Sequence, residues 1–411
     1  MPILLEEDLQ RPLPRMYRVR QQFDETRLED VAGTVRAELA NPEIRALVKP
    51  GMRIAVGVGS RGIQNLYTIV ETTVNSLKEL GAEPFIVSAM GSHGGGTEEG
   101  QREVLAGYGI TEERLGVPVV TTVDTVYLGN CANGRPVWFD RAAYEADLIV
   151  PINRVKLHTD FVGPIQSGLC KMLVIGLGNH KGCSAVHEEA PEVFADAIEE
   201  TARLILQKAP VGFGIAILEN AYDKTYAVEA VPAEHLVERE KELVQIAKGN
   251  MPYIMLDEAD VIVCGAIGKD ISGAGFDPNI LGRSSVLKQF VLHIPRYQRL
   301  VLCDVTPASH GNGIGVGLFD VITKKVAEQL DLESMYANAI ACNCLGDASV
   351  PCTVDDEETA IRVALKCCRN IDRDHPRIIR IQNTLHLGEI EVSEALLDAV
   401  RADSRMSLIE N

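Results

Sequence analysis

The sequence predicts an α/β protein made of two α/β domains with mainly parallel sheets and an active-site cleft between the domains. Short apolar runs alternate with amphipathic stretches, the pattern of βαβ units and parallel sheets. The chain has 411 residues, 46% of them hydrophobic, and exceeds the size at which one core keeps growing. Glycine-rich loops follow several apolar runs, where α/β proteins gather their sites.

The elements are expected in the following order. Residues 53–58 form a strand, and Ile63–Leu80 form a helix because apolar residues recur there every three to four positions. Further strands are expected at 84–90, 147–152, 212–218, 260–264 and 299–304. Further helices are expected at 191–207, 235–248, 284–292, 318–330 and 354–368.

One acid-rich stretch, residues 231–257, is the best domain boundary. The N-terminal domain is expected at 1–257 and the C-terminal α/β domain at 258–411. The last helix is expected to pack back on the N-terminal domain.

The net charge of −18 argues against nucleic acid and anionic membranes as partners, since their phosphates would repel such a surface. No apolar run approaches the roughly 20 residues of a membrane span, and the N-terminus is acidic where a signal peptide is basic. Cysteines inside the apolar runs 261–264 and 300–303 indicate buried thiols in a reducing compartment. The chain is therefore expected in the cytoplasm, and its oligomeric state is not predicted.

The run Gly57–Gly62 satisfies the pattern GxGxxG between an expected strand and an expected helix. That pattern indicates a dinucleotide site, but residues 84–90 lack the acidic residue that would hold the ribose. The alternative is carboxylate capture by Ser60, by amides at the helix N-terminus and by the Arg61 guanidinium. We favour carboxylate capture.

His93 lies in a glycine-rich loop after an expected strand, where an imidazole is not committed to packing. The alternative is a turn histidine beside a helix that Thr97 caps. Both interpretations stay open from the residues alone.

The segment Asn153–His187 concentrates imidazoles and amines among glycines. Its charged and imidazole residues include Lys156, His158, Asp160, Lys171, His180, Lys181 and His187. Ser167 and Gly168 are expected to present amides to a phosphate. Residues 185–188 are expected to start a helix that aims His187, a good metal ligand, toward Lys171. His180 and Lys181 are interpreted as ordinary loop residues.

Two glycine-rich loops, Gly268–Gly275 and Gly311–Gly317, follow strands of the expected C-terminal domain. Neither ends in the Gly-Lys-Ser/Thr of a P-loop. Lys269 is expected either to contact an anionic substrate or to be a solvated loop lysine.

Together, Ser60-Arg61, Gly91-Ser92-His93, Asn153–His158, Ser167-Gly168, Lys171 and His187 resemble the nickel-pincer nucleotide-dependent lactate racemase family. The resemblance covers most of the expected N-terminal domain. It implies a 2-hydroxyacid racemase or epimerase, an isomerase that inverts C2 by reversible hydride transfer.

The resemblance also implies the roles of individual residues. Lys171 would carry the nickel-pincer nucleotide, a pyridinium-3-thioamide-5-thiocarboxylic acid mononucleotide, through a covalent bond, with Ser167 and Gly168 beside it. His187 would ligate nickel, and His93 and His158 would be the acid/base pair. Ser60 and Arg61 would bind the small anionic substrate, and Lys269 remains the further candidate that its own loop offers. Cofactor maturation enzymes are implied partners, and protein produced without them is expected to lack the cofactor.

This chain departs from the lactate-specific members of the family in several ways, among them a longer stretch between His158 and Lys171 and polar loops around Lys269 and Asn312. Gly94 stands where they have an arginine, and the only tryptophan is Trp138 rather than one in the C-terminal domain. A larger sugar acid, an aldonate, is therefore the favoured substrate. The alternatives are an NAD-dependent 2-hydroxyacid dehydrogenase and a non-catalytic nucleotide-binding protein.

Overall fold

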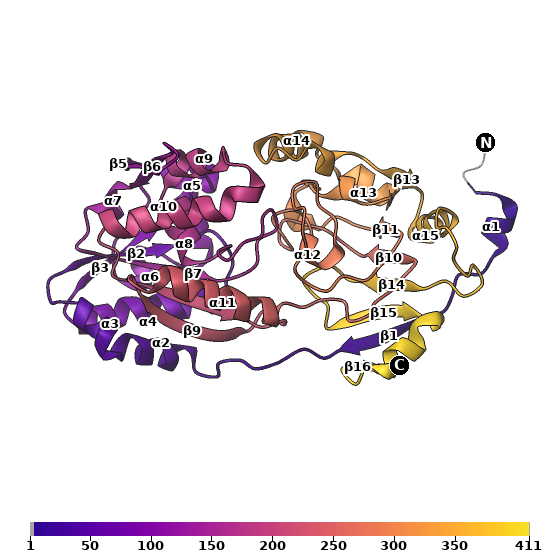
Figure 1. Cartoon of the computed structure of the whole chain (residues 1–411), viewed down its shortest axis with the longest axis horizontal. Coiled ribbons are helices and arrows are strands. Elements are labelled where there is room, and N and C mark those ends of the chain that lie inside the picture. The colour runs from indigo at the N-terminus through magenta and orange to yellow at the C-terminus, as the bar shows by residue number, and fades with distance from the viewer. Residues whose placement is uncertain (1–3, 411) are drawn as a thin grey trace. The chain divides into compact units, whose positions relative to one another are not determined.

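The computed structural model describes residues 4–410, which form two compact units. One unit comprises residues 25–251, and the other comprises residues 4–24 together with 252–410. Each unit contains a mainly parallel sheet with helices packed against it (Figure 1). The predicted α/β class is confirmed.

The unit 25–251 contains a six-stranded sheet of order β4-β3-β2-β7-β8-β9, parallel except for β9. Its strands are β2 (Arg53–Val58), β3 (Glu83–Ser88), β4 (Val119–Val120), β7 (Leu148–Arg154), β8 (Phe213–Glu219) and β9 (Thr225–Pro232). A separate hairpin joins β5 (Thr125–Asn130) to β6 (Pro136–Asp140). Four of these strands lie within one or two residues of the predicted runs.

The order of this sheet creates a topological switch point between β2 and β7. The chain leaves β2 toward β3 on one side, whereas β7 continues toward β8 on the other side. Loops at the carboxyl ends of two such strands diverge and leave room for a ligand. The switch point therefore collects the residues that follow β2 and β7.

Helices cover both faces of this sheet (Figure 1). They are α2 (Val31–Ala40), α3 (Pro42–Leu47), α4 (Leu66–Glu79), α5 (Glu98–Gly107), α6 (Glu112–Leu115), α7 (Arg141–Tyr144), α8 (Leu169–Lys171), α9 (Asn179–His187), α10 (Phe194–Lys208) and α11 (Leu236–Asn250). Short turns of helix are η1 (Gly94–Gly96), η2 (Met172–Gly176, a π-helix) and η3 (Pro191–Val193). The apolar stripe predicted for 63–80 is buried, as Val70, Val74 and Leu77 show.

The start of α4 differs from the prediction. Asn65 adopts a left-handed conformation with φ 60°, so the helix begins at Leu66 and not at Ile63. Ser60 and Arg61 therefore lie in a loop several residues before the helix. The expected anion site, with helix N-terminal amides directly beside Ser60, is not formed.

The other unit contains an eight-stranded sheet of order β13-β12-β11-β10-β14-β15-β1-β16. Its strands are β1 (Met16–Gln21), β10 (Val261–Cys264), β11 (Arg299–Leu302), β12 (Val321–Thr323), β13 (Cys352–Val354), β14 (Ile378–Ile381), β15 (Glu389–Ser393) and β16 (Met406–Leu408). The five strands from β13 to β14 are parallel, and the last three pair antiparallel.

The N-terminal strand belongs to this second unit, which differs from the expected division at 257/258. β1 pairs with β15 and with β16, so the described residues 4–24 join 252–410. The chain then enters the unit 25–251 and returns at Pro252. Strand pairing between residues near positions 19 and 390 leaves no pattern in the local sequence. The acid-rich stretch at 231–257 therefore could not show that the N-terminal strand belongs to the second unit.

The helices of this unit are α1 (Glu6–Gln10), α12 (Pro278–Leu281), α13 (Lys324–Gln329), α14 (Leu332–Ala341), α15 (Glu357–Lys366) and α16 (Leu397–Ala402). Short 3-10 turns are η4 (Pro307–Ser309), η5 (Val316–Leu318), η6 (Leu345–Ala348) and η7 (Glu394–Leu396).

Three predicted helices of this unit need correction. Residues 284–292 form no helix, because Ser284 Oγ accepts the amides of Val286 and Leu287 and closes a turn. The predicted helix 318–330 contains strand β12 and only then α13. The last helix, α16, packs within its own unit, where Leu397 and Val400 join the core around β15.

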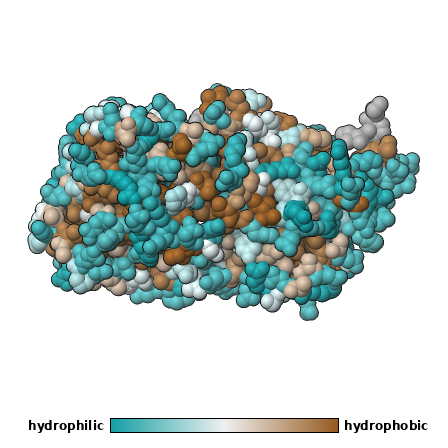
Figure 2. Space-filling model, in the orientation of Figure 1, coloured by the Kyte–Doolittle hydropathy of each residue, from teal (hydrophilic) through white to brown (hydrophobic). Residues whose placement is uncertain are grey.

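One helix of this unit exposes apolar side chains. Leu332, Tyr336 and Ile340 recur at four-residue spacing on α14 and are 42%, 47% and 69% exposed. Figure 2 shows apolar surface at the position of α14 in Figure 1. Among the described residues, no helix is both long and apolar enough to cross a membrane.

Candidate functional site

The first pair of candidate residues comes from the loops after β2 and β3. Ser60 Oγ contacts His93 Nδ1, and Tyr108 donates a hydrogen bond to the Ser60 carbonyl oxygen at 2.9 Å. Ser60, expected to bind substrate, therefore touches the imidazole of His93. Thr97 caps α5 as predicted by accepting the Gly100 amide.

Gly94 explains one departure from the lactate-specific pattern. Its φ is +64°, and a Cβ there would lie 2.6 Å from the Gln101 nitrogen. That nitrogen belongs to the backbone of α5 and cannot rotate away, and the buried Gln101 side chain also holds this loop by donating to the Gly91 carbonyl at 3.2 Å. An arginine at position 94 would require a different loop.

The second pair is His158 and Lys171, whose Nε2 and Nζ atoms are in contact. His158 Nδ1 accepts the Asp160 amide at 3.1 Å, and its own amide donates to Gln166 Oε1 at 2.7 Å. The imidazole stacks on Phe161 with ring centroids 4.3 Å apart. With Nδ1 bonded to the Asp160 amide, Nε2 is the ring nitrogen that faces the amine of Lys171.

The surroundings lower the pKa of both His158 and Lys171, so both side chains lose their charge at lower pH than usual. Burial lowers the pKa of His158 well below its ordinary 6.5, and the charges of Lys171, His187 and Arg61 lower it further. Burial lowers the pKa of Lys171 from 10.5 to about 8, opposed by Asp160 and assisted by Arg61. A neutral amine is a nucleophile, and a neutral imidazole is a base.

Arg61 lies near this pair, as its influence on both pKa values indicates. Its side chain is exposed and forms no ion pair with another residue of the range 4–410. The nearby Arg154, by contrast, is paired with Glu219. Of these two arginines, Arg61 is therefore the one whose guanidinium can bind a substrate carboxylate through two parallel hydrogen bonds.

His187 is the last residue of α9, which corrects the prediction that a helix starts at 185–188. Its Nδ1 bonds the Cys183 carbonyl oxygen one turn earlier at 2.7 Å. Because a carbonyl can only accept, Nδ1 carries the proton and Nε2 keeps its lone pair. His180 and Lys181 also lie on α9, not in a loop, and both are exposed.

Ser167 and Gly168 do not offer the expected row of amides. The Ser167 amide donates to the Lys156 carbonyl at 3.1 Å, and the Lys156 amide donates back at 2.9 Å. The next two amides, of Leu169 and Cys170, donate to the carboxylate of Glu240. A protein carboxylate therefore occupies the position that the sequence suggested for a phosphate.

Sequence reasoning missed Glu240. It lies on α11, where Leu236, Val237, Leu243, Val244 and Ala247 are also buried. A carboxylate on the apolar face of an amphipathic helix is an available signal, because burying a charge is costly unless it is bonded. Tyr108 and Phe161 were missed as well, and no local pattern marks them.

Glu240 leads to a prediction about stability. Burial raises its pKa from 4.5 to about 7, while the amides of Cys170 and Leu169 oppose the rise. The folded protein then binds this proton more tightly than the unfolded chain, so the free energy of unfolding falls between about pH 4.5 and pH 7. Glu240→Gln should be more stable than wild type at pH 8, by roughly 2 to 4 kcal/mol, and similar near pH 4. Urea unfolding at both pH values measures this, and a pH-independent difference would contradict it.

Lys269 lies in the other unit, in the loop after β10. Its Nζ donates to the Gly273 carbonyl at 2.7 Å and contacts Asn338 Oδ1. Its amide donates to Ser309 Oγ at 2.8 Å. A role in substrate binding stays a prediction for this residue.

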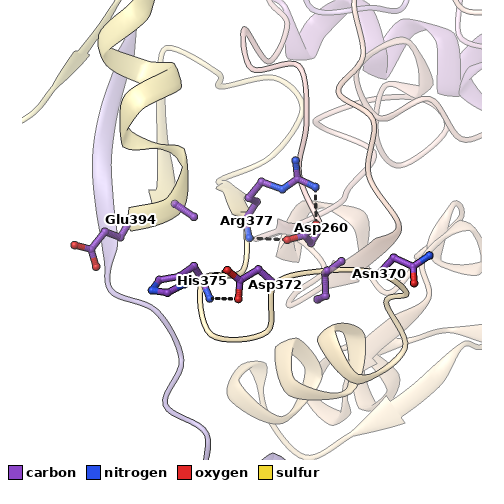
Figure 3. Close-up of a pocket in the computed structure, with 8 residues that line it drawn as sticks. Asp260, Asn370, Asp372, His375, Arg377 and Glu394 are labelled. Atoms are coloured by element: carbon purple, nitrogen blue, oxygen red, sulfur yellow. Dashed lines mark hydrogen bonds and ion pairs between the residues drawn. The ribbon is translucent and has the colours of Figure 1, made fainter.

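A cavity of about 630 Å³ in the same unit is lined by residues that the sequence did not single out. Arg377 bonds Asp260 through its amide at 2.7 Å and its guanidinium at 2.9 Å, and His375 lies 3.1 Å from Asp372 (Figure 3). Both basic groups already have carboxylate partners. This cavity is therefore a poor candidate for an anionic substrate.

The donors near Lys171 fit the cofactor that the resemblance implies. An amine with a pKa of about 8 can be acylated near neutral pH, and an exposed histidine with an open Nε2 can ligate nickel. The charge of Lys171 lowers the pKa of His187, so the two residues lie in one neighbourhood.

These features define a class: an α/β protein with an imidazole–amine site at a sheet switch point. Residues 11–196 match the family described as the lactate racemase N-terminal domain. A search of curated proteins finds no match. The matched part of the chain is therefore similar to the N-terminal domain of lactate racemases.

Two solved structures share the fold. The lactate racemase apoprotein from Thermoanaerobacterium thermosaccharolyticum is 14% identical, with 89% of this chain and 93% of that chain covered and a TM-score of 0.54. A protein from Thermotoga maritima is 13% identical, with 80% and 85% covered and a TM-score of 0.50. Both likenesses concern the fold.

Proposed function

We propose that this protein is a racemase or epimerase that inverts C2 of a 2-hydroxy acid, using a nickel-pincer nucleotide attached to Lys171. The observation that carries the proposal is the contact between His158 Nε2 and Lys171 Nζ. An imidazole in contact with that amine supports the proposal that Lys171 is the attachment residue and His158 an acid/base residue beside it. The lactate racemase-like N-terminal domain supports this assignment.

Lys171 and His187 would hold the cofactor. Lys171 supplies the amine for the covalent bond, and His187 supplies Nε2 to nickel. When bound, the group supplies an electron-poor pyridinium that accepts the C2 hydrogen as hydride and returns it to either face. The residues of the chain do the remaining work of binding and proton transfer.

His158 and His93 would exchange the hydroxyl proton. One imidazole accepts it from one enantiomer, and the other accepts it from the opposite enantiomer. The pKa of His158, lowered first by burial, keeps its ring neutral at neutral pH. Ser60 holds the ring of His93 from Nδ1, and Arg61 takes the substrate carboxylate.

The favoured substrate class is a sugar acid. Gly94 leaves no arginine beside His93, where the lactate-specific members would have one. Cofactor maturation enzymes are the proposed partners, and the cytoplasm is the proposed location.

The test uses protein produced with the maturation enzymes. Lactate and several aldonates, each deuterated at C2, are incubated with this protein, and inversion and label are followed by chiral chromatography and mass spectrometry. We expect inversion with deuterium retained at C2 and no requirement for added NAD. Exchange of the label with water, or turnover only with NAD, would contradict the proposal. Faster turnover of lactate than of every aldonate would overturn the substrate class alone.

A further inference from the structure

Glu240 is the buried group that the proposed chemistry leaves unexplained. Its side chain on α11 is completely buried, and its Oε2 accepts the Cys170 amide at 2.9 Å. The Leu169 amide and the Cys170 thiol bond the same carboxyl group. Glu240 Oε1 has no hydrogen-bond partner among residues 4–410. Three of its interactions thus go to the two residues that directly precede Lys171.

The position of Gly168 leaves no room for a side chain beside this carboxylate. A Cβ at Gly168 would lie 2.6 to 2.7 Å from three atoms of the Glu240 carboxyl group. The Gly168 carbonyl accepts a hydrogen bond from Asn153 Nδ2 at 2.8 Å. The backbone before Lys171 is therefore fixed from two sides, by a strand residue and by a helix residue.

We propose that Glu240 is a positioning residue that fixes the segment Gly168–Lys171 and so aims the Lys171 amine at His158. The segment needs such a support because α8 is only three residues long and is followed by a π-helix, whose hydrogen bonding is irregular. A short helix of this kind does not hold its own direction. The bond from the Cys170 amide to the buried carboxyl group, together with the Leu169 amide and the Cys170 thiol at the same group, takes the place of the missing helical turn.

This inference rests on the proposed function in one respect: the direction of the Lys171 side chain is important because Lys171 is the proposed attachment residue. The test is nevertheless made on protein without cofactor. Wild-type protein, Glu240→Gln, Glu240→Ala and the exposed control Glu238→Ala on the same helix are pulsed with trace acetic anhydride between about pH 6 and pH 10. Peptide mass spectrometry then follows acetylation of Lys171, with Lys181 as the internal reference.

We expect Lys171 in wild-type protein, Glu240→Gln and Glu238→Ala to react with an apparent pKa near 8. Glutamine keeps an oxygen that accepts the two amides, so it should rescue the position. In Glu240→Ala the segment relaxes into water, the apparent pKa moves toward 10.5, and acetylation at pH 8 falls at least about tenfold. An unchanged Lys171 profile in a folded but less stable Glu240→Ala would overturn the inference, since a structural role alone predicts that result.

A second variant keeps the test decisive if Glu240→Ala does not fold. Gly168→Ala places a methyl group against the carboxylate and should shift the Lys171 profile in the same direction. In the double variant the carboxylate is gone and the methyl group has room, so Gly168→Ala should add little to Glu240→Ala. Additive effects, or a normal profile in Gly168→Ala, would contradict the proposed positioning. Absence of an adduct on matured wild-type protein would count only against the proposed function.

Discussion

Lys171→Arg is expected to reduce racemisation by protein produced with the maturation enzymes to the uncatalysed rate, a loss of about 10⁶-fold or more. Arginine keeps a positive charge and a long side chain, but its guanidinium stays protonated and is not acylated. The amine of Lys171, with a pKa of about 8, is the group that would form the covalent bond. Chiral assay of turnover and intact-mass measurement of the adduct test the two parts of this expectation.

Lys181→Arg is the matched control for this experiment. Lys181 is exposed on α9 of the same unit, with its Nζ 4.7 Å from the Trp138 ring centroid. The same substitution there should leave both the adduct and the turnover within about twofold of wild type. An adduct of unchanged mass on Lys171→Arg would show that another residue carries the cofactor.

The second large effect is expected from His158→Gln, which should lower turnover by about 10² to 10⁴-fold in both directions. The loss affects both directions because the imidazole that accepts the hydroxyl proton of one enantiomer must donate a proton when that same enantiomer is formed in the reverse direction. Glutamine keeps a hydrogen-bonding side chain but has no titratable nitrogen. Initial rates from each pure enantiomer measure the effect, and a loss confined to binding, with kcat unchanged, would contradict an acid/base role.

The role of His158 as a base also predicts how kcat/KM changes with pH. The pKa of His158 lies well below 6.5, chiefly because of burial and then because of Lys171, His187 and Arg61. The protonated ring cannot accept a proton, so the acidic limb of kcat/KM should fall only well below pH 6.5. Attachment of the cofactor removes the charge of Lys171, so this limb should then lie at higher pH than the titration of His158 in protein without cofactor. An acidic limb that is identical in the two states would contradict the coupling.

Local patterns predicted much of the unit 25–251. The strand at 53–58 is observed with those bounds, and the helix predicted at 235–248 is α11. These elements are readable because an apolar run or a three-to-four-residue periodicity records burial directly. The density of histidines and lysines between 153 and 187 indicated a candidate site, because residue type is also readable from the sequence.

The errors came where distant residues decide local structure. The turn at Ser284 is an exception, since this serine bonds the amide of Val286 two positions later, but nothing near Met16 indicates a strand paired with β15. Ser60 was expected to bind substrate, but it contacts His93, 33 positions away. Ser167 was expected to offer its amide, but Lys156 already accepts it.

The sequence by itself determined the α/β class, most strands of the unit 25–251 and the set of imidazoles and amines that form its candidate site, because periodicity and residue type are local properties. Only the tertiary structure decided that His158 lies against Lys171 and that Glu240, 69 positions after Lys171, supports the backbone before it. The physical reason is that the order of strands in a sheet and the packing of a helix over it depend on long-range contacts, and no local pattern encodes their partners.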